Sequence, residues 1–160
     1  MEQTEFMAAA ADYQDMIYRV ALHQTASPQD AEDTVQEVLL RLYTSTKTYE
    51  SPEHLRRWLL RVTVNAARDL LRSPWRRRRV SLSELPETPA FQEPEQEALY
   101  QAVLALPEKY RAVLDLFYYE ELSAREIGEV LGIRASAVTT RLSRARAMLK
   151  EQLKEGWQDE

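Results

Sequence analysis

The sequence predicts an all-α protein of two small helical domains joined by a flexible linker, with a helix-turn-helix in the second domain. Hydrophobic residues make up 44% of the 160 residues, so at least one core can form, and only three residues are glycine. Helix formers such as Ala, Leu, Glu, Gln and Arg dominate, whereas runs of β-branched residues are scarce. Four of the seven prolines fall between Ser73 and Pro94, in a stretch without helical periodicity, which is typical of a linker.

These observations predict a first domain over residues 1–73, a linker over 74–94 and a second domain over 95–160. The chain has no cysteine, so it offers neither a disulfide framework nor a thiolate metal site, and this fits a reducing cytoplasm. The N-terminus lacks a basic segment followed by an apolar one, and no apolar run approaches the roughly 20 residues that cross a bilayer. We therefore expect a cytoplasmic protein without a signal peptide and without membrane insertion.

Charge is distributed unevenly along the chain, although the net charge is only −5. Met1 to Leu40 hold eight acidic residues and one basic residue, Arg19. Arg56 to Arg79 hold nine arginines and one acid, and Val130 to Lys150 hold five basic residues and no acid. Because local charge steers association with phosphate more than the mean does, the two basic segments favour contact with nucleic acid.

The first domain is expected to hold an early helix over about residues 5–23 and a second helix that begins after Ser27. Ser27 is a favourable N-cap residue, and a proline follows it at the first helical position. The second helix has one apolar stripe that we expect to face the core: Ala31, Val35, Val38 and Leu42. At about 100° per residue, Asp33, Glu37 and Leu40 share the opposite face. That face is either a solvated acidic surface or a docking surface for a protein, and the spacing leaves both interpretations open.

A third helix is expected after Ser51, which repeats the serine and proline start. Its predicted core stripe consists of Leu55, Leu59, Val62, Ala66 and Leu70. A sector of roughly 80° on the far side carries Arg57, Arg61, Asn65, Arg68 and Arg72. Four guanidinium groups on one face repel each other unless anions neutralise them, and Trp58 beside them can stack on an unpaired base. The alternative is a solvated arginine face, with Trp58 completing the core.

The second domain contains a pattern of helix, tight turn and helix. Ser123 and Glu126 form a capping box at the start of the first helix, and Gly132 stands where the chain must turn. The expected core positions are Ile127, Val130, Leu131, Val138, Leu142, Ala145, Leu149 and Leu153. The opposite face of the second helix carries Ser136, Thr140, Ser143, Arg144 and Ala147, with Arg141 on its flank. Small hydroxyl residues and arginines on one helix face favour major-groove recognition over an ordinary helical hairpin.

An enzymatic site is not expected. His23 and His54 stand alone, and three scattered glycines cannot form a loop that cradles phosphate. Carboxylates are plentiful, but they fall on faces that we expect to be solvated. The sequence therefore predicts a protein that is not an enzyme and that needs no cofactor or metal.

Three segments resemble bacterial RNA polymerase sigma factors of the extracytoplasmic-function group. Asp30 to Tyr43 resembles the segment that grips the clamp helices of the polymerase, and Arg57 to Arg72 resembles the next segment, which contacts and melts the promoter. Leu106 to Lys150 resembles the domain that reads the promoter upstream. The resemblance implies binding to core RNA polymerase and to promoter DNA. Control by an anti-sigma factor is usual in this family, so the resemblance admits that partner as well.

The helix faces and the resemblance together assign roles to individual positions, and Trp58, Asn65, Asp69 and Arg72 are those that match the family's pattern for the minus-ten region of the promoter. The predicted polymerase-binding residues are Asp33, Gln36, Glu37 and Leu40. The residues predicted to contact the minus-ten element of the promoter are Arg57, Trp58, Arg61, Asn65, Arg68 and Arg72. The loop Thr44 to Ser51 resembles a loop that captures a flipped base in this family. The residues predicted to contact the minus-thirty-five element of the promoter are Arg134, Ser136, Thr139, Thr140, Arg141, Ser143 and Arg144. Val64 departs from the arginine that family members often carry there.

A rival interpretation is a helix-turn-helix regulator that acts without core polymerase. It accounts for the second domain, but it leaves the acidic face and the separate arginine-faced helix unexplained.

Overall fold

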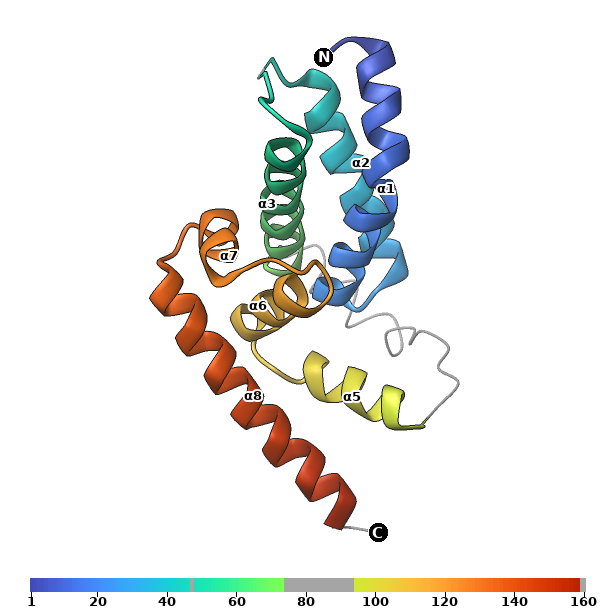
Figure 1. Ribbon diagram of the computed structural model, residues 1–160. Helices are drawn as coiled ribbons and strands as arrows, with labels where there is room; N and C mark the ends of the chain where they lie inside the picture. Colours follow the sequence, from blue (N-terminus) through green and yellow to red (C-terminus); the bar gives the residue numbers. More distant parts are fainter. Residues whose placement is uncertain (47, 74–93, 159–160) are drawn as a thin grey trace. The chain divides into compact units, whose positions relative to one another are not determined.

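The computed structural model describes residues 1–46, 48–73 and 94–158, and every regular element within these ranges is an α-helix (Figure 1). The helices belong to two compact units, Met1–Glu87 and Thr88–Glu160. The predicted all-α fold with two helical units is therefore confirmed. Residues 74–93 of the predicted linker, which include four consecutive arginines at positions 76–79, lie outside the described residues, and the domain limits at residues 73 and 95 stay predictions.

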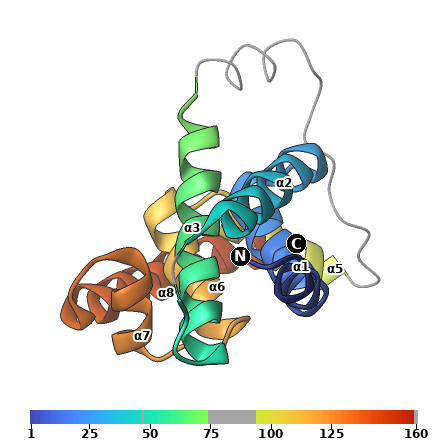
Figure 2. The same cartoon turned by 90° about the horizontal axis from the view of Figure 1, so that it is seen from above.

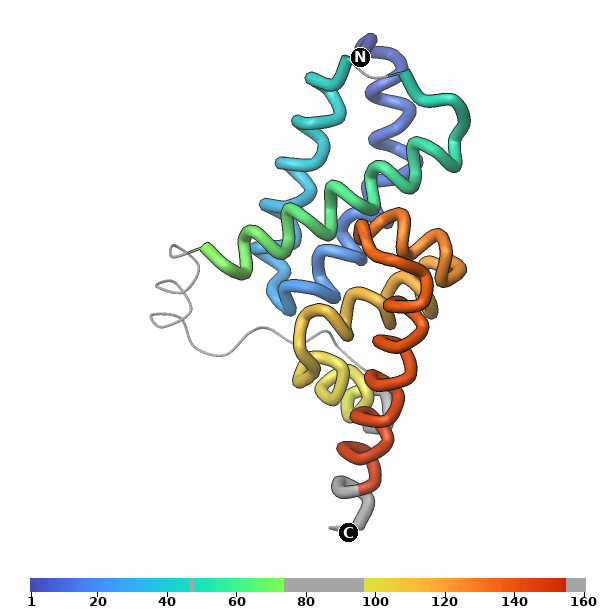
Figure 3. Tube along the Cα trace, turned by 90° about the vertical axis from the view of Figure 1, so that its left-hand side faces the viewer, coloured from blue at the N-terminus to red at the C-terminus, as the bar shows by residue number. Residues whose placement is uncertain are grey.

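Three helices form the first unit: α1 (Gln3–Thr25), α2 (Pro28–Thr44) and α3 (Pro52–Leu71). Each of them packs against the other two. Helices α1 and α2 lie on the same side of α3, which crosses both of them obliquely (Figures 2 and 3). The core of this unit therefore lies where the three helices meet.

Serine caps start α2 and α3 as the sequence predicts. The Ser27 hydroxyl accepts a hydrogen bond from the Asp30 N–H at 3.3 Å, and the Ser51 hydroxyl accepts one from the His54 N–H at 3.1 Å. Each bond satisfies a backbone donor that the first helical turn leaves without a partner. Helix α1 ends at Thr25, and the left-handed φ of 57° at its C-cap residue, Ala26, turns the chain toward α2.

The predicted core stripe of α2 is confirmed, because all four of its residues are buried. The predicted stripe of α3 is only partly right. Leu59 and Ala66 are buried, but Leu55, Val62 and Leu70 are only half-buried. The buried face instead extends to Leu60, Thr63, Val64 and Ala67. The reason is that α3 packs against two helices at once, which moves its buried face around the helix axis.

The second unit contains α5 (Pro94–Leu104), α6 (Glu108–Tyr118), α7 (Ala124–Leu131) and α8 (Ala135–Gln158). Helix α8 is the longest and packs against the other three, which follow one side of it in Figure 1. Ile127 and Val130 of α7 are buried, as are Val138, Leu142 and Ala145 of α8. The predicted core positions Leu131, Leu149 and Leu153 are half-buried.

The turn between α7 and α8 has the features of a helix-turn-helix. The Ser123 hydroxyl accepts from the Glu126 N–H at 3.1 Å, and a Glu126 carboxylate oxygen accepts from the Ser123 N–H at 3.0 Å, so the capping box is confirmed. Gly132 ends α7 with a φ of 72°, a left-handed conformation that favours glycine. Gly128 is buried beneath the turn and accepts a hydrogen bond from the Ile133 N–H at 3.0 Å.

Candidate functional site

The outer face of α2 carries both acidic and apolar side chains. Asp33, Gln36, Glu37 and Leu40 are all exposed, and Leu40 shows 63% of its surface to solvent. Glu37 accepts a hydrogen bond of 2.7 Å from Arg41 one turn later, and both side chains are about half exposed. An exposed leucine framed by carboxylates can contribute both apolar area and charge to a protein interface.

Tyr43 belongs to the same outer face, although the sequence analysis did not select it. It lies seven residues after Gln36, hence on the same row of the helix, and it is 48% exposed. Its ring meets the ring of Phe6 edge to face, with centroids 5.1 Å apart, which fixes the end of α2 against the start of α1. The seven-residue spacing was the signal that would have found it.

Polar and cationic side chains follow α3 along one face. Arg61 and Arg72 are exposed, whereas Arg57, Asn65 and Arg68 are half-buried. Arg57 and Arg68 lie within about 40° of the buried Val64 around the helix axis. Arg72 is the residue that caps the C-terminus of α3, and its N–H donates to the Arg68 carbonyl at 3.1 Å. The predicted minus-ten residues therefore share one side of the helix, with different degrees of exposure.

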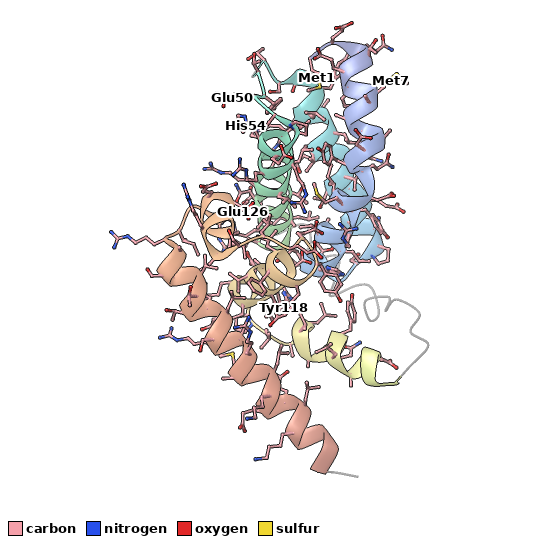
Figure 4. All side chains as sticks on the ribbon, viewed as in Figure 1. Met1, Met7, Glu50, His54, Tyr118 and Glu126 are labelled. Carbon is pink, nitrogen blue, oxygen red and sulfur yellow. The ribbon has the colours of Figure 1, made fainter. Side chains whose placement is uncertain are left out.

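An aromatic cluster joins α3 to the loop before it. The Tyr49 ring lies 5.5 Å from the Trp58 ring and 5.7 Å from the His54 ring. The Tyr49 and Ser45 hydroxyls share a hydrogen bond of 3.1 Å, and the Glu50 N–H donates to His54 Nδ1 at 3.2 Å. Figure 4 shows Glu50 and His54 beside each other where α3 begins. Trp58, which is half-buried, thus has its position fixed by the loop.

A groove of about 660 Å³ lies between this loop and the start of α1. Its lining includes Tyr49, Leu55 and, from α1, Tyr13, whose hydroxyl donates to the Pro52 carbonyl at 3.3 Å. The groove and the aromatic cluster share the Tyr49 side chain. Glu5, Asp12 and Glu50 also line the groove, so its wall is acidic as well as aromatic, and its volume is large enough to receive one base.

The exposed face of α8 contains most of the predicted minus-thirty-five residues. Arg134 immediately precedes the helix, and Ser136, Thr139, Thr140, Ser143 and Arg144 are exposed on it. Arg141 is half-buried on the flank. The Thr139 and Thr140 hydroxyls donate to the carbonyls four residues earlier, at 3.1 and 3.0 Å, so their outer lone pairs stay available as acceptors.

The predicted residues thus form three separate sets, on α2 and α3 in the first unit and on α8 in the second. Within the described part of the chain, no group of three or more His, Cys, Asp or Glu side chains is arranged to hold a metal ion. No helix among the described residues is both long and apolar enough to cross a membrane.

Family models match both units. Residues 10–77 match the model described as Sigma-70 region 2, and residues 96–149 match the model described as Sigma-70, region 4. The ECF RNA polymerase sigma factor SigW of Bacillus subtilis is 30% identical over 171 residues, which cover 96% of this chain and 91% of that protein. The chain belongs to the sigma-70 family of transcription initiation factors.

Other relatives support the extracytoplasmic-function (ECF) group for this sigma factor. The ECF RNA polymerase sigma factor SigE of Mycolicibacterium smegmatis is 35% identical over 153 residues, which cover 87% of this chain but 58% of that protein. The sigma factor RpoE of Bartonella quintana, solved in complex with the anti-sigma factor NepR, has a TM-score of 0.77 at 19% identity. The structural similarity covers 94% of this chain and 97% of the other chain, and it shows that the two proteins share a fold.

Proposed function

We propose that this sigma factor binds core RNA polymerase through the exposed face of α2, contacts and melts the minus-ten region through α3, and reads the minus-thirty-five element through α8. The observation that supports the proposal most is the order of region 2 and region 4 in one chain, each with its candidate residues on an exposed helix face. Holoenzyme assembled in this way initiates transcription of a specific set of genes.

Melting promoter DNA requires free energy. The sequence has no nucleotide-binding motif, so we look for this free energy in binding rather than in nucleotide hydrolysis by the chain. Unpairing and unstacking one base costs a few kcal/mol, which capture of the exposed base by aromatic stacking offsets. The Trp58 and Tyr49 rings, and the groove beside them, are the groups that we assign to this capture. On this proposal the chain is not itself an enzyme, it uses no cofactor or metal, and it works in the cytoplasm.

Run-off transcription tests the proposal directly. Core polymerase with the purified chain should produce discrete transcripts from a subset of genomic fragments, and core alone should not. Footprints with and without core separate the sigma factor from the rival regulator, because the regulator would protect the same DNA without polymerase. Absence of core-dependent transcripts would contradict the proposal.

Partner control is part of the same proposal. The RpoE structure is a complex with the anti-sigma factor NepR, and we propose that an anti-sigma factor binds this chain and holds it inactive. A cognate anti-sigma factor should reduce run-off transcripts when it is added before core polymerase.

Replacing Arg144 with Ala should cost roughly 1–3 kcal/mol of promoter affinity, because an arginine in the major groove can make a bidentate contact with guanine. The same substitution should relax the base preference at one upstream position. Arg141→Ala should have the smaller effect, since that side chain is half-buried. Transcription from a library of upstream element variants measures both effects, with Lys154→Ala on the same helix as the control. Wild-type transcription from every promoter variant would exclude base reading by these arginines.

Replacing Trp58 with Ala should reduce promoter opening while leaving upstream binding intact. Stacking of one base on an aromatic ring is worth about 1–3 kcal/mol, and the substitution removes the ring. Permanganate reactivity of unpaired thymines measures opening, and footprinting measures upstream binding. Trp58→Phe, which keeps an aromatic surface beside Tyr49, should retain most of the opening. Full thymine reactivity with Trp58→Ala would show that Trp58 only completes the packing of α3.

A further inference from the structure

Arg146 of α8 is held in place by two aromatic side chains of α6, although it is exposed. Its Nε donates a hydrogen bond of 2.8 Å to the hydroxyl of Tyr118, 28 residues earlier. The central carbon of the guanidinium lies 5.4 Å from the centroid of the Phe117 ring and 5.6 Å from that of the Tyr118 ring. The two rings meet edge to face at 5.0 Å. Figure 4 marks Tyr118 at the end of α6.

This arrangement leaves one edge of the guanidinium available. An arginine has five N–H donors, and only Nε–H is used here, so the two terminal nitrogens have no acceptor in the described part of the chain. A pair of parallel N–H groups fits two oxygens of a phosphate, and contact with aromatic faces fixes the plane in which those groups lie. A guanidinium group whose orientation is already fixed loses less rotamer freedom on binding than a mobile arginine side chain does.

The position of Arg146 on α8 suits a phosphate rather than a base. At about 100° per residue, the row of Ser136, Thr140 and Ser143 runs down the middle of the exposed face. Arg144 and Arg146 lie on opposite flanks of that row, each about 80° from Ser136. No hydrogen bond to a described side chain holds Arg144, so it can turn toward the central row, whereas the hydrogen bond to Tyr118 keeps Arg146 on its flank. A helix in the major groove points its central row at the base edges, and its flanks face the two sugar-phosphate backbones.

We propose that Arg146 binds one phosphate of the DNA backbone beside the minus-thirty-five element, and that Tyr118 is the residue that positions it. The inference rests on the proposed function of α8 as the upstream reading helix. It adds a sequence-independent contact, which sets the register of the helix on the duplex, to the base contacts proposed for Arg144.

The test is the affinity of holoenzyme for a promoter duplex chosen by the run-off assay, measured across a salt series. Arg146→Gln should lower affinity roughly tenfold, and it should lower the magnitude of the slope of log affinity against log salt by about 0.9, the value for one phosphate on duplex DNA. The loss should be the same factor on duplexes with altered upstream elements, because a phosphate carries no base identity.

Tyr118→Phe keeps the ring and removes only the hydroxyl that holds Nε. We expect a smaller loss of affinity than for Arg146→Gln, and no additional loss when the two substitutions are combined. Lys109→Gln is the matched control, since its ammonium nitrogen lies 5.1 Å from the centroid of the Tyr110 ring on α6. That variant should keep the wild-type salt slope.

Two results would overturn the inference. An unchanged salt slope for Arg146→Gln, with a lowered unfolding temperature, would mean that the contact only joins α6 to α8. A changed base preference would mean that Arg146 reads a base. The proposed function is tested separately by the wild-type protein, because it fails if wild-type holoenzyme gives no core-dependent transcript.

Discussion

Gly128→Ala should unfold the helix-turn-helix and abolish upstream promoter binding. A Cβ atom at Gly128 would lie 2.6 Å from the backbone oxygen of Ile133, a separation that real Cβ atoms essentially never show. The neighbour is backbone in a tight turn, so it cannot move aside as a flexible side chain does. We expect a loss of about 3 kcal/mol or more, which is a large fraction of the stability of a unit of this size. Chemical denaturation and amide hydrogen exchange of the full chain measure the loss.

Gly132→Ala is the matched comparison within the same turn. A Cβ at Gly132 meets nothing within 4 Å, so the only cost is its left-handed φ of 72°. For a residue other than glycine that conformation costs about 1–2 kcal/mol, less than we expect at Gly128. Exchange protection of α1 to α3 should stay at the wild-type level in both variants. Equal stability of Gly128→Ala and the wild-type protein would show that the turn can open at no cost.

The double substitution Asp33→Arg with Glu37→Arg should weaken binding to core polymerase by roughly 100-fold or more. Reversing two charges in the proposed polymerase-binding face removes the attraction to a complementary surface and adds repulsion, which costs several kcal/mol. Both side chains are exposed on the face of α2 that also presents Leu40, so neither contributes to the core. Affinity for core, measured with labelled sigma factor in competition with the wild-type protein, gives the result.

An effect of the double substitution on the stability of α2 must be distinguished from an effect on polymerase affinity. Glu37 pairs with Arg41, so the substitution places like charges one turn apart, but such a pair costs only about 0.2–0.5 kcal/mol. Circular dichroism should therefore show unchanged helicity. Asp12→Arg with Asp15→Arg makes the same change of net charge on exposed positions of α1, and it should leave polymerase affinity unchanged. Wild-type affinity in the α2 variant would place the docking surface elsewhere.

Features that act within one or two turns of a helix were determined by the sequence alone. Ser27 and Ser51 start α2 and α3, and Ser123 with Glu126 starts α7, because a cap needs only its own side chain and the next few N–H groups. Gly132 marks the turn for the same local reason. The core stripe of α2 was also predictable, since its apolar residues are separated cleanly from its acidic ones.

The buried face of α3 was decided by tertiary packing. Thr63 is fully buried, and its hydroxyl can be buried without loss because it donates a hydrogen bond of 2.6 Å to the Leu59 carbonyl of the same helix. The small side chains of Ala66 and Ala67 lie on the same buried face, which α1 and α2 cover. Leu55 and Leu70 are more hydrophobic than Thr63, so a stripe drawn from apolar residues is displaced to one edge of the buried face and includes only Leu59 and Ala66 of it.

Contacts between distant segments were likewise decided only by the tertiary structure. The need for glycine at position 128 arises from the carbonyl of Ile133, which approaches it only after the chain has turned. The contact of Arg146 with Tyr118 joins residues that no periodicity relates. Caps and turns follow from the sequence because their partners are neighbours in the chain, whereas these contacts require two helices to pack first.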